Sequence, residues 1–152
     1  NRNVQALMNT ALIAALYAVI TIVLAPISYS NIQVRISEAL TLLPFFWGFK
    51  AALGLGIGCM IANIYGGLGL IDIIFGSLLT LSAGIFTARA RSLYEAGIYP
   101  VVFNALGVAL ILNQVAGFPY LPTAVYVGIG EFISVYLIGI PLMKLLQKKI
   151  NL

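Results

Sequence analysis

The chain has 152 residues, of which 62% are apolar and 8% are charged. A soluble domain carries about 45–50% apolar and about 25% charged residues, so this composition excludes a surface that faces water over most of its area. The net charge of +4 does not indicate nucleic-acid binding, because the basic residues are scattered among apolar runs and form no stripe with interleaved aromatic residues.

Long apolar runs, separated by charges, prolines and glycine-rich turns, predict an integral membrane protein. The runs are continuous rather than alternating, which favours helices over a closed barrel. At about 20 residues per span, the chain has room for five to seven helices. We therefore expect one all-α domain over residues 1–152, a bundle of six transmembrane helices.

The first helix is predicted over residues 4–25, because Pro26 ends the first apolar run. A polar loop follows at residues 28–33. Ser37 is of a type that caps helix N-termini, so a second helix is predicted from there to about Lys50. The other four helices are predicted at residues 51–65, 70–88, 100–115 and 123–146.

Three prolines are expected to shape these helices. Pro100 is placed near the start of the fifth helix, while Pro44 and Pro141 are expected to kink the second and the sixth. The second and third helices have only about 14 residues each, or roughly 21 Å, so a re-entrant hairpin is an alternative. Lys50 argues against the hairpin, because it would place an unpaired ammonium group at the bilayer centre.

The basic residues predict the orientation in the membrane. With six spans, one side receives all but one of them, and Arg35 lies alone on the other side. The cytoplasmic side of a membrane protein carries the excess of Lys and Arg, so both termini are predicted to be cytoplasmic. The basic residues assigned to that side are Arg2, Lys50, Arg89, Arg91, Lys144, Lys148 and Lys149.

Polar residues are predicted to gather in the outer half of the bundle. Glu38 and Asp72 fall at the outer ends of predicted helices, and Glu131 falls roughly 12 Å inside the sixth. Asn63 and Asn104 fall in the third and fifth helices. Because ionisable groups in a membrane are costly, they indicate a ligand pocket, with Arg35 beside it.

Each of these residues also has a structural interpretation. Arg35 and Glu38 are three residues apart and could pair on one helical face, or could be a solvated Arg and a Glu that favours a helix N-terminus. Asp72 could cap the fourth helix. Glu131 could be a neutral carboxyl group that bonds a neighbouring helix, and Asn104 could hold helices together.

The first helix carries two overlapping pairs of alanines at a spacing of four, Ala11 with Ala15 and Ala14 with Ala18. Small residues at this spacing allow two helices to approach closely. The partner could be another helix of the bundle or a second protein.

The sequence predicts no catalytic residues, cofactor or metal site. It has no His, no P-loop lysine motif, and no Ser, Cys or Thr with an evident base partner. Cys59 lies alone in an apolar run, so no disulfide is expected.

Residues 33–44 (QVRISEALTLLP) resemble a signature of the QueT family, the queuosine-precursor S components of energy-coupling-factor transporters. The resemblance continues, in order, at Ala62-Asn63 before Gly66-Gly67 and at residues 70–77, 100–105 and 130–134. The short segment that follows Arg89 departs from the family pattern, and we assign no role to residues 92–99.

The resemblance implies an S component of the bacterial plasma membrane, which captures a substrate at the outer face for uptake driven by partner subunits. It implies a site capped by the loop between the first two helices. It implies two ATPase subunits and a membrane-spanning coupling subunit, which would contact Ala11 and Ala15, or Ala14 and Ala18 in the other register.

The implied ligand is pre-queuosine-1 or a related 7-deazaguanine. Its ring N–H and amine form a donor pair that one carboxylate can accept, its ammonium arm suits a second carboxylate, and its ring oxygen suits Arg35 or an Asn amide. Rival hypotheses are an S component for another vitamin, a stand-alone channel or a proton-coupled carrier that uses Glu131, and a scaffolding membrane protein.

Overall fold

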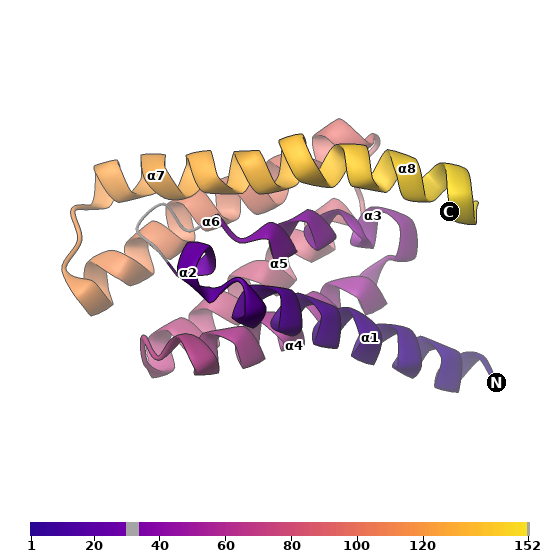
Figure 1. The fold of residues 1–152 in the computed structure, drawn as a ribbon, viewed down its shortest axis with the longest axis horizontal. Helices are drawn as coiled ribbons and strands as arrows, with labels where there is room; N and C mark the ends of the chain where they lie inside the picture. Colours follow the sequence, from indigo (N-terminus) through magenta and orange to yellow (C-terminus); the bar gives the residue numbers. More distant parts are fainter. Residues whose placement is uncertain (30–33, 152) are drawn as a thin grey trace.

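The computed structural model describes residues 1–29 and 34–151, and every regular element in these ranges is helical (Figure 1). The elements include one 3-10 helix, η1, and two π-helical segments, η2 and η3. In chain order they are α1 (Arg2–Val23), α2 (Ala25–Ser28), η1 (Ile36–Leu42), α3 (Pro44–Trp47), α4 (Phe49–Gly66), η2 (Asp72–Gly76), α5 (Ser77–Thr87), α6 (Leu93–Ala116), α7 (Tyr120–Phe132), η3 (Ile133–Gly139) and α8 (Ile140–Ile150).

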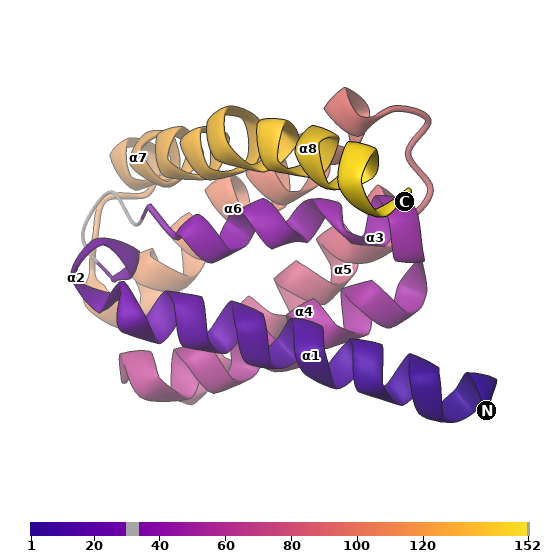
Figure 2. The same cartoon turned by 45° about the vertical axis from the view of Figure 1, so that its right-hand side comes forward.

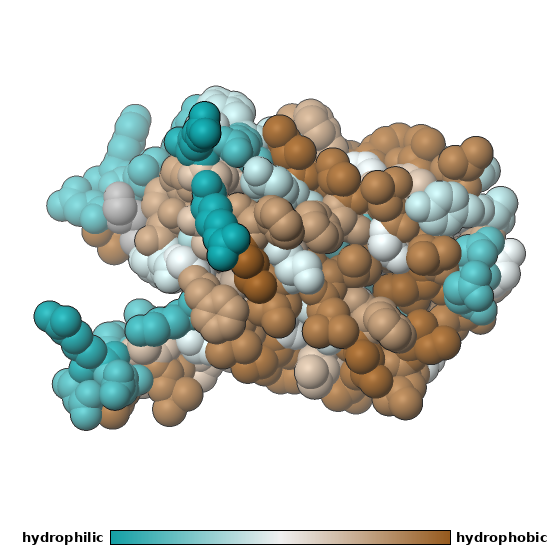
Figure 3. Space-filling view, turned by 180° about the vertical axis from the view of Figure 1, so that it is seen from behind, coloured by the Kyte–Doolittle hydropathy of each residue, from teal (hydrophilic) through white to brown (hydrophobic). Residues whose placement is uncertain are grey.

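Four helical stretches of the described chain are long and apolar enough to cross a membrane: Arg2–Val23, Phe49–Gly66, Leu93–Ala116 and Tyr120–Ile150. Two apolar stretches are shorter, Ile36–Trp47 and Asp72–Thr87. On the face that Figure 3 shows, most of the surface between the two ends is hydrophobic, and hydrophilic residues gather toward the ends. These features confirm an all-helical membrane protein.

Both termini lie at the same end of the bundle (Figures 1 and 2). An even number of crossings requires this arrangement. The same end carries Lys144 of α8, whose ammonium group donates to the Tyr94 hydroxyl at 2.6 Å and so joins α8 to the start of α6. The side of the membrane that this end faces stays a prediction.

The second predicted helix differs most from the structure. Residues 36–42 form a 3-10 helix whose N-cap is Arg35, so the prediction that Ser37 is the N-cap is wrong. The Ser37 hydroxyl instead contacts the Thr21 hydroxyl of α1 at 2.5 Å. Gly48, with a φ of 70°, ends α3, so the helix stops before Lys50, which lies in the first turn of α4. A 3-10 helix rises about 2 Å per residue instead of about 1.5 Å, so it lengthens this short segment.

The fifth helix begins seven residues earlier than predicted, at Leu93, and Pro100 therefore lies inside it. The residues without a predicted role form its start: Ser92 is the N-cap and accepts from the Glu95 backbone N–H at 3.1 Å. The Ser-x-x-Glu pattern at residues 92–95 is a sequence signal for such a start.

The other two prolines do not interrupt α-helices. Pro44 lies in the first turn of α3, directly after η1, and Pro141 lies in the first turn of α8, directly after η3. Since proline lacks a backbone N–H, it is tolerated best in a first helical turn. The expected kinks are therefore junctions between helix types.

Close packing between α1 and α4 depends on two glycines. A Cβ atom at Gly54 would lie 2.7 Å from the Thr10 carbonyl oxygen, and one at Gly58 would lie 2.7 Å from the Ala14 carbonyl oxygen. Ala14 and Ala18 are buried on this face of α1. This pair of small residues therefore packs within the bundle.

Candidate functional site

The six residues predicted to bind a ligand line one small buried pocket. They come from η1 and its N-cap, α4, η2, α6 and α7, which meet in the interior of the bundle. The cavity has a volume of about 20 Å³, which is room for about one water molecule. Its lining consists of Arg35, Glu38, Cys59, Asn63, Asp72, Gly76, Thr80, Asn104, Val108 and Glu131.

Arg35 is held in place by three groups. Its Nη1 donates to the Asn63 side-chain oxygen at 3.1 Å, and its Nε donates to the Ser28 carbonyl oxygen at 3.4 Å. Its guanidinium group lies 5.2 Å from the centre of the Tyr29 ring, within the range of a cation–π interaction. Arg35 is only 9% exposed, so it is not the solvated loop residue that one interpretation expected.

Asn63 connects this arginine to η2. Its Nδ2 donates to the Asp72 carbonyl oxygen at 3.0 Å, while its oxygen accepts from Arg35. Both ends of the amide are therefore used. A Cβ atom at Gly76 would lie 2.5 Å from Asn63 Nδ2, so the Asn63 amide fits there only because residue 76 has no side chain.

Glu38 is 2% exposed and bonds to helices far away in the sequence. One carboxyl oxygen accepts from the Tyr17 hydroxyl of α1, and the other accepts from Asn104 Nδ2 of α6 at 3.2 Å. In the described part of the chain Glu38 makes no hydrogen bond to Arg35, which donates to Asn63 and Ser28. The pairing of Arg35 with Glu38, one of the two alternatives from the sequence, is therefore not found.

Glu131 is the last residue but one of α7 and is 5% exposed. Its carboxyl group lines the same cavity as the carboxyl group of Glu38 and the amide of Asn104. Its Oε2 atom is buried and has no partner among the described residues. A buried oxygen of this kind costs free energy unless another group forms a hydrogen bond with it.

Asp72 is 5% exposed and is the first residue of η2. No side chain caps this segment, so the capping interpretation of Asp72 is not supported. Glu131 also lies next to a π-helical segment, because only Phe132 separates it from η3. Single π-helical turns are frequent at functional sites, where they redirect side chains.

Sequence reasoning missed several residues of this pocket. Tyr17 is fully buried and holds Glu38, and Cys59, Gly76 and Thr80 complete the lining. One signal was present: a tyrosine well inside the first apolar run lies away from the interfaces that tyrosines prefer in membrane proteins. The predicted cap of the site, residues 28–33, falls mostly on residues 30–33, which lie outside the described part of the chain.

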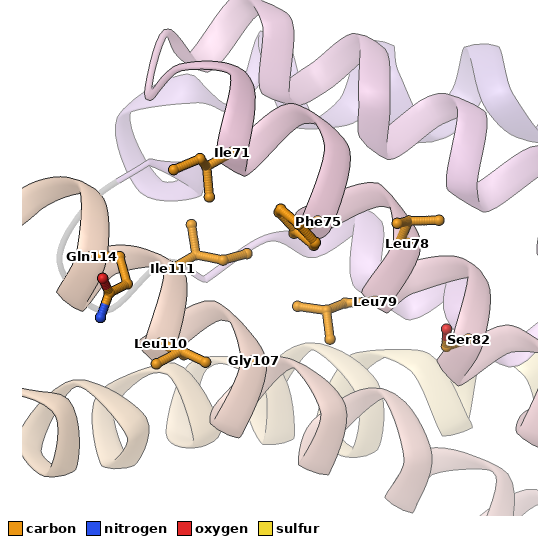
Figure 4. Close-up of a pocket in the computed structure, with 9 residues that line it drawn as sticks. All are labelled: Ile71, Phe75, Leu78, Leu79, Ser82, Gly107, Leu110, Ile111 and Gln114. Atoms are coloured by element: carbon orange, nitrogen blue, oxygen red, sulfur yellow. The ribbon is translucent and has the colours of Figure 1, made fainter.

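A second, larger cavity of about 380 Å³ lies between the η2–α5 stretch and α6 (Figure 4). Its lining is apolar except for Ser82 and Gln114, which lie near opposite ends of the cavity in that view. Leu78 and Leu110 on its walls are about half exposed. A polar ligand would find almost no hydrogen-bond partners there, so this groove is not the predicted site.

The alanines of α1 separate into two faces. Ala14 and Ala18 are 5% and 4% exposed and pack inside the bundle, whereas Ala11 and Ala15 are exposed. The structure thus distinguishes the two registers that the sequence left open. Of the four alanines, only Ala11 and Ala15 remain accessible to another protein.

The sequence profile described as QueT transporter matches residues 7–148, nearly the whole chain. The chain belongs to the QueT transporter family. It is also 34% identical, over 96% of its own length and 94% of the relative's, to a Lactococcus lactis protein named "Queuosine precursor transporter QueT". No solved structure matches the chain.

Membership of the QueT family confirms two predictions made from the sequence. The family and the curated relative are transporters, which agrees with the absence of enzyme chemistry in the prediction. A transporter with several apolar helices is a multi-pass protein of the cell membrane. The roles of the individual pocket residues in binding stay predictions.

Proposed function

We propose that this QueT family member is the substrate-binding S component of an energy-coupling-factor importer, and that it captures pre-queuosine-1 or a closely related 7-deazaguanine. The observation that carries the proposal is the buried pocket, in which three carboxyl groups and two amides from separate helical segments meet beside one arginine. The name of the Lactococcus lactis relative supports the substrate class.

The pocket chemistry suits a flat cationic base. The free oxygen of Glu131 is an acceptor for the ligand's donor pair, and Asp72 is an acceptor for an ammonium arm. Arg35 and the amide of Asn104 are donors for a ring oxygen. Three carboxyl groups against one guanidinium group favour a cation over an anionic vitamin.

A 7-deazaguanine is much larger than one water molecule, so binding must widen the cavity. The segments that line it are not regular α-helices: η1 carries Glu38, η2 carries Asp72, and η3 starts two residues after Glu131. We propose that these segments accommodate the ligand by changing their hydrogen-bond pattern, because such segments mark hinges in helices.

We further propose that the exposed face around Ala11 and Ala15 docks the coupling subunit, which works with two ATPase subunits. Small residues allow a partner helix to approach α1 closely there. Exposed Leu7 and Leu12 flank this face and add apolar area.

The six-span topology, with both termini in the cytoplasm, predicts which sites an external reagent reaches. We expect an impermeant thiol reagent, added to intact cells, to leave Lys50→Cys unlabelled, because Lys50 belongs to the cytoplasmic set of basic residues. Permeabilised cells supply the positive control, and a Cys59→Ser background removes the single native thiol. Labelling of Lys50→Cys from outside would contradict the topology.

Mass spectrometry of small molecules extracted from the purified protein tests the proposed substrate. We expect a 7-deazaguanine with an aminomethyl arm from cells that contain this compound. Recovery of an unrelated vitamin instead would overturn the substrate assignment, and co-purification of ATPase subunits would distinguish the S component from a stand-alone carrier.

A further inference from the structure

Two acidic side chains, Glu38 and Glu131, line the same small cavity. The cavity has a volume of about 20 Å³, and both residues are at most 5% exposed. A carboxylate only accepts hydrogen bonds, so two ionised carboxylates around so small a space have no hydrogen to share and repel each other. Their proximity is favourable when one of the two carries a proton.

Around the pair, the pocket supplies one cation and one further carboxyl group. The titratable groups that face it from the packed elements are Tyr17 of α1, Arg35 before η1, Cys59 of α4 and Asp72 of η2. Arg35, the single cation of this group, donates hydrogen bonds to Asn63 and Ser28, and among the described residues it donates none to either glutamate.

The hydrogen bonds also indicate which glutamate holds the proton. Glu38 accepts from the Tyr17 hydroxyl and from Asn104 Nδ2, and two donors of this kind stabilise an ionised carboxylate. Glu131 has a buried oxygen without a partner in the described residues, which suits a neutral acid better than an ion.

We propose that the Glu38–Glu131 pair holds one proton in the empty pocket and that a cationic ligand releases this proton to solvent when it binds. The inference rests on the proposed function, because it deepens the chemistry of the same site. The charge balances: the ligand brings one positive charge as its ammonium group, and one proton leaves for the buffer. The pocket would therefore select cationic over neutral 7-deazaguanines more strongly as pH rises.

Linkage gives the expected pH dependence. While the pair still holds its proton, release of about one proton strengthens binding by about tenfold for each unit of pH increase. The dependence levels off once the pair is already ionised in the empty protein. A neutral 7-deazaguanine that carries a nitrile in place of the aminomethyl arm should show no such increase.

Calorimetric titration of the purified protein with pre-queuosine-1 tests the proposal. The titration is run at one pH in two buffers of different ionisation enthalpy, phosphate and Tris. For one released proton, we expect the binding enthalpies measured in the two buffers to differ by the difference between the buffers' ionisation enthalpies. We expect Glu131→Gln to remove that difference. Binding with equal heats in both buffers would overturn the proton exchange and leave the proposed function intact, whereas a lack of binding would count against the proposed function.

An infrared measurement tests the proton without any ligand. A protonated carboxyl group has a C=O stretch that is separate from the bands of carboxylates. We expect this band in the spectrum of the wild-type protein and its loss in Glu131→Gln, while Glu95→Gln, which changes a glutamate outside the pocket, keeps it. Identical spectra of wild type and Glu131→Gln in this region would overturn the proposal.

Discussion

Glu131→Gln is expected to weaken binding of pre-queuosine-1 by about ten- to hundredfold. Glutamine keeps the shape of the side chain and one acceptor oxygen but removes the acidic group. Hydrogen bonds to charged groups contribute about 1.5–3 kcal/mol, which corresponds to this range of affinity. Because Glu131 is 5% exposed, water competes weakly there, so the effect should lie toward the upper end.

Glu38→Gln should have a comparable effect. From the sequence, Glu38 is predicted nearer the outside and could pair with Arg35, which would predict a smaller loss. In the structure Glu38 is only 2% exposed and accepts hydrogen bonds from Tyr17 and Asn104. Loss of its carboxylate should therefore disturb both ligand binding and the packing of the neighbouring helices.

Calorimetry on purified single variants measures both effects, with circular dichroism to verify folding. Glu95→Gln is the matched control, because Glu95 lies in the first turn of α6 and bonds Tyr99 and the Arg91 backbone outside the pocket. If both pocket variants are folded and bind like wild type, the pocket assignment is wrong. Glu131 is then a buried carboxyl group that only holds α7 to its neighbours.

Ala15→Trp is expected to abolish uptake while ligand binding stays within about twofold of wild type. Ala15 is exposed on α1, so a large side chain there should separate the docking face from the coupling subunit without reaching the pocket. The measurement compares uptake in cells that contain the partner subunits with calorimetric binding to the purified variant.

A substitution on the other face of α1 is the control. Ala14 is 5% exposed, and its carbonyl oxygen would lie 2.7 Å from a Cβ atom at Gly58. Ala14→Leu should therefore lower the thermal stability of the purified protein, because added bulk in a packed interior is destabilising. Normal transport by Ala15→Trp in the presence of the partners, or loss of its binding, would refute the docking role.

The sequence predicted most of the helices and the members of the pocket because both depend on strong, local signals. Apolar runs near the width of a bilayer define spans, and Glu131 stands out because an acid inside such a run is costly. The structure brings Arg35, Glu38 and Glu131 around one cavity even though almost a hundred residues separate the first from the last.

Details that depend on tertiary contacts were not predictable in this way. The 3-10 geometry of η1 places Glu38 against Tyr17 and Asn104, and no local pattern encodes those distant partners. The choice between the alanine registers likewise depends on Gly54 and Gly58 of another helix. The early start of α6 is different, because Ser92 and Glu95 signalled it in the sequence.

Titration of the purified wild-type protein with pre-queuosine-1, alongside the anionic vitamin biotin, tests the central claim most directly. An acidic pocket with a single guanidinium group predicts saturable binding of one pre-queuosine-1 per chain and no detectable heat with biotin. Binding of biotin without binding of pre-queuosine-1 would contradict the account.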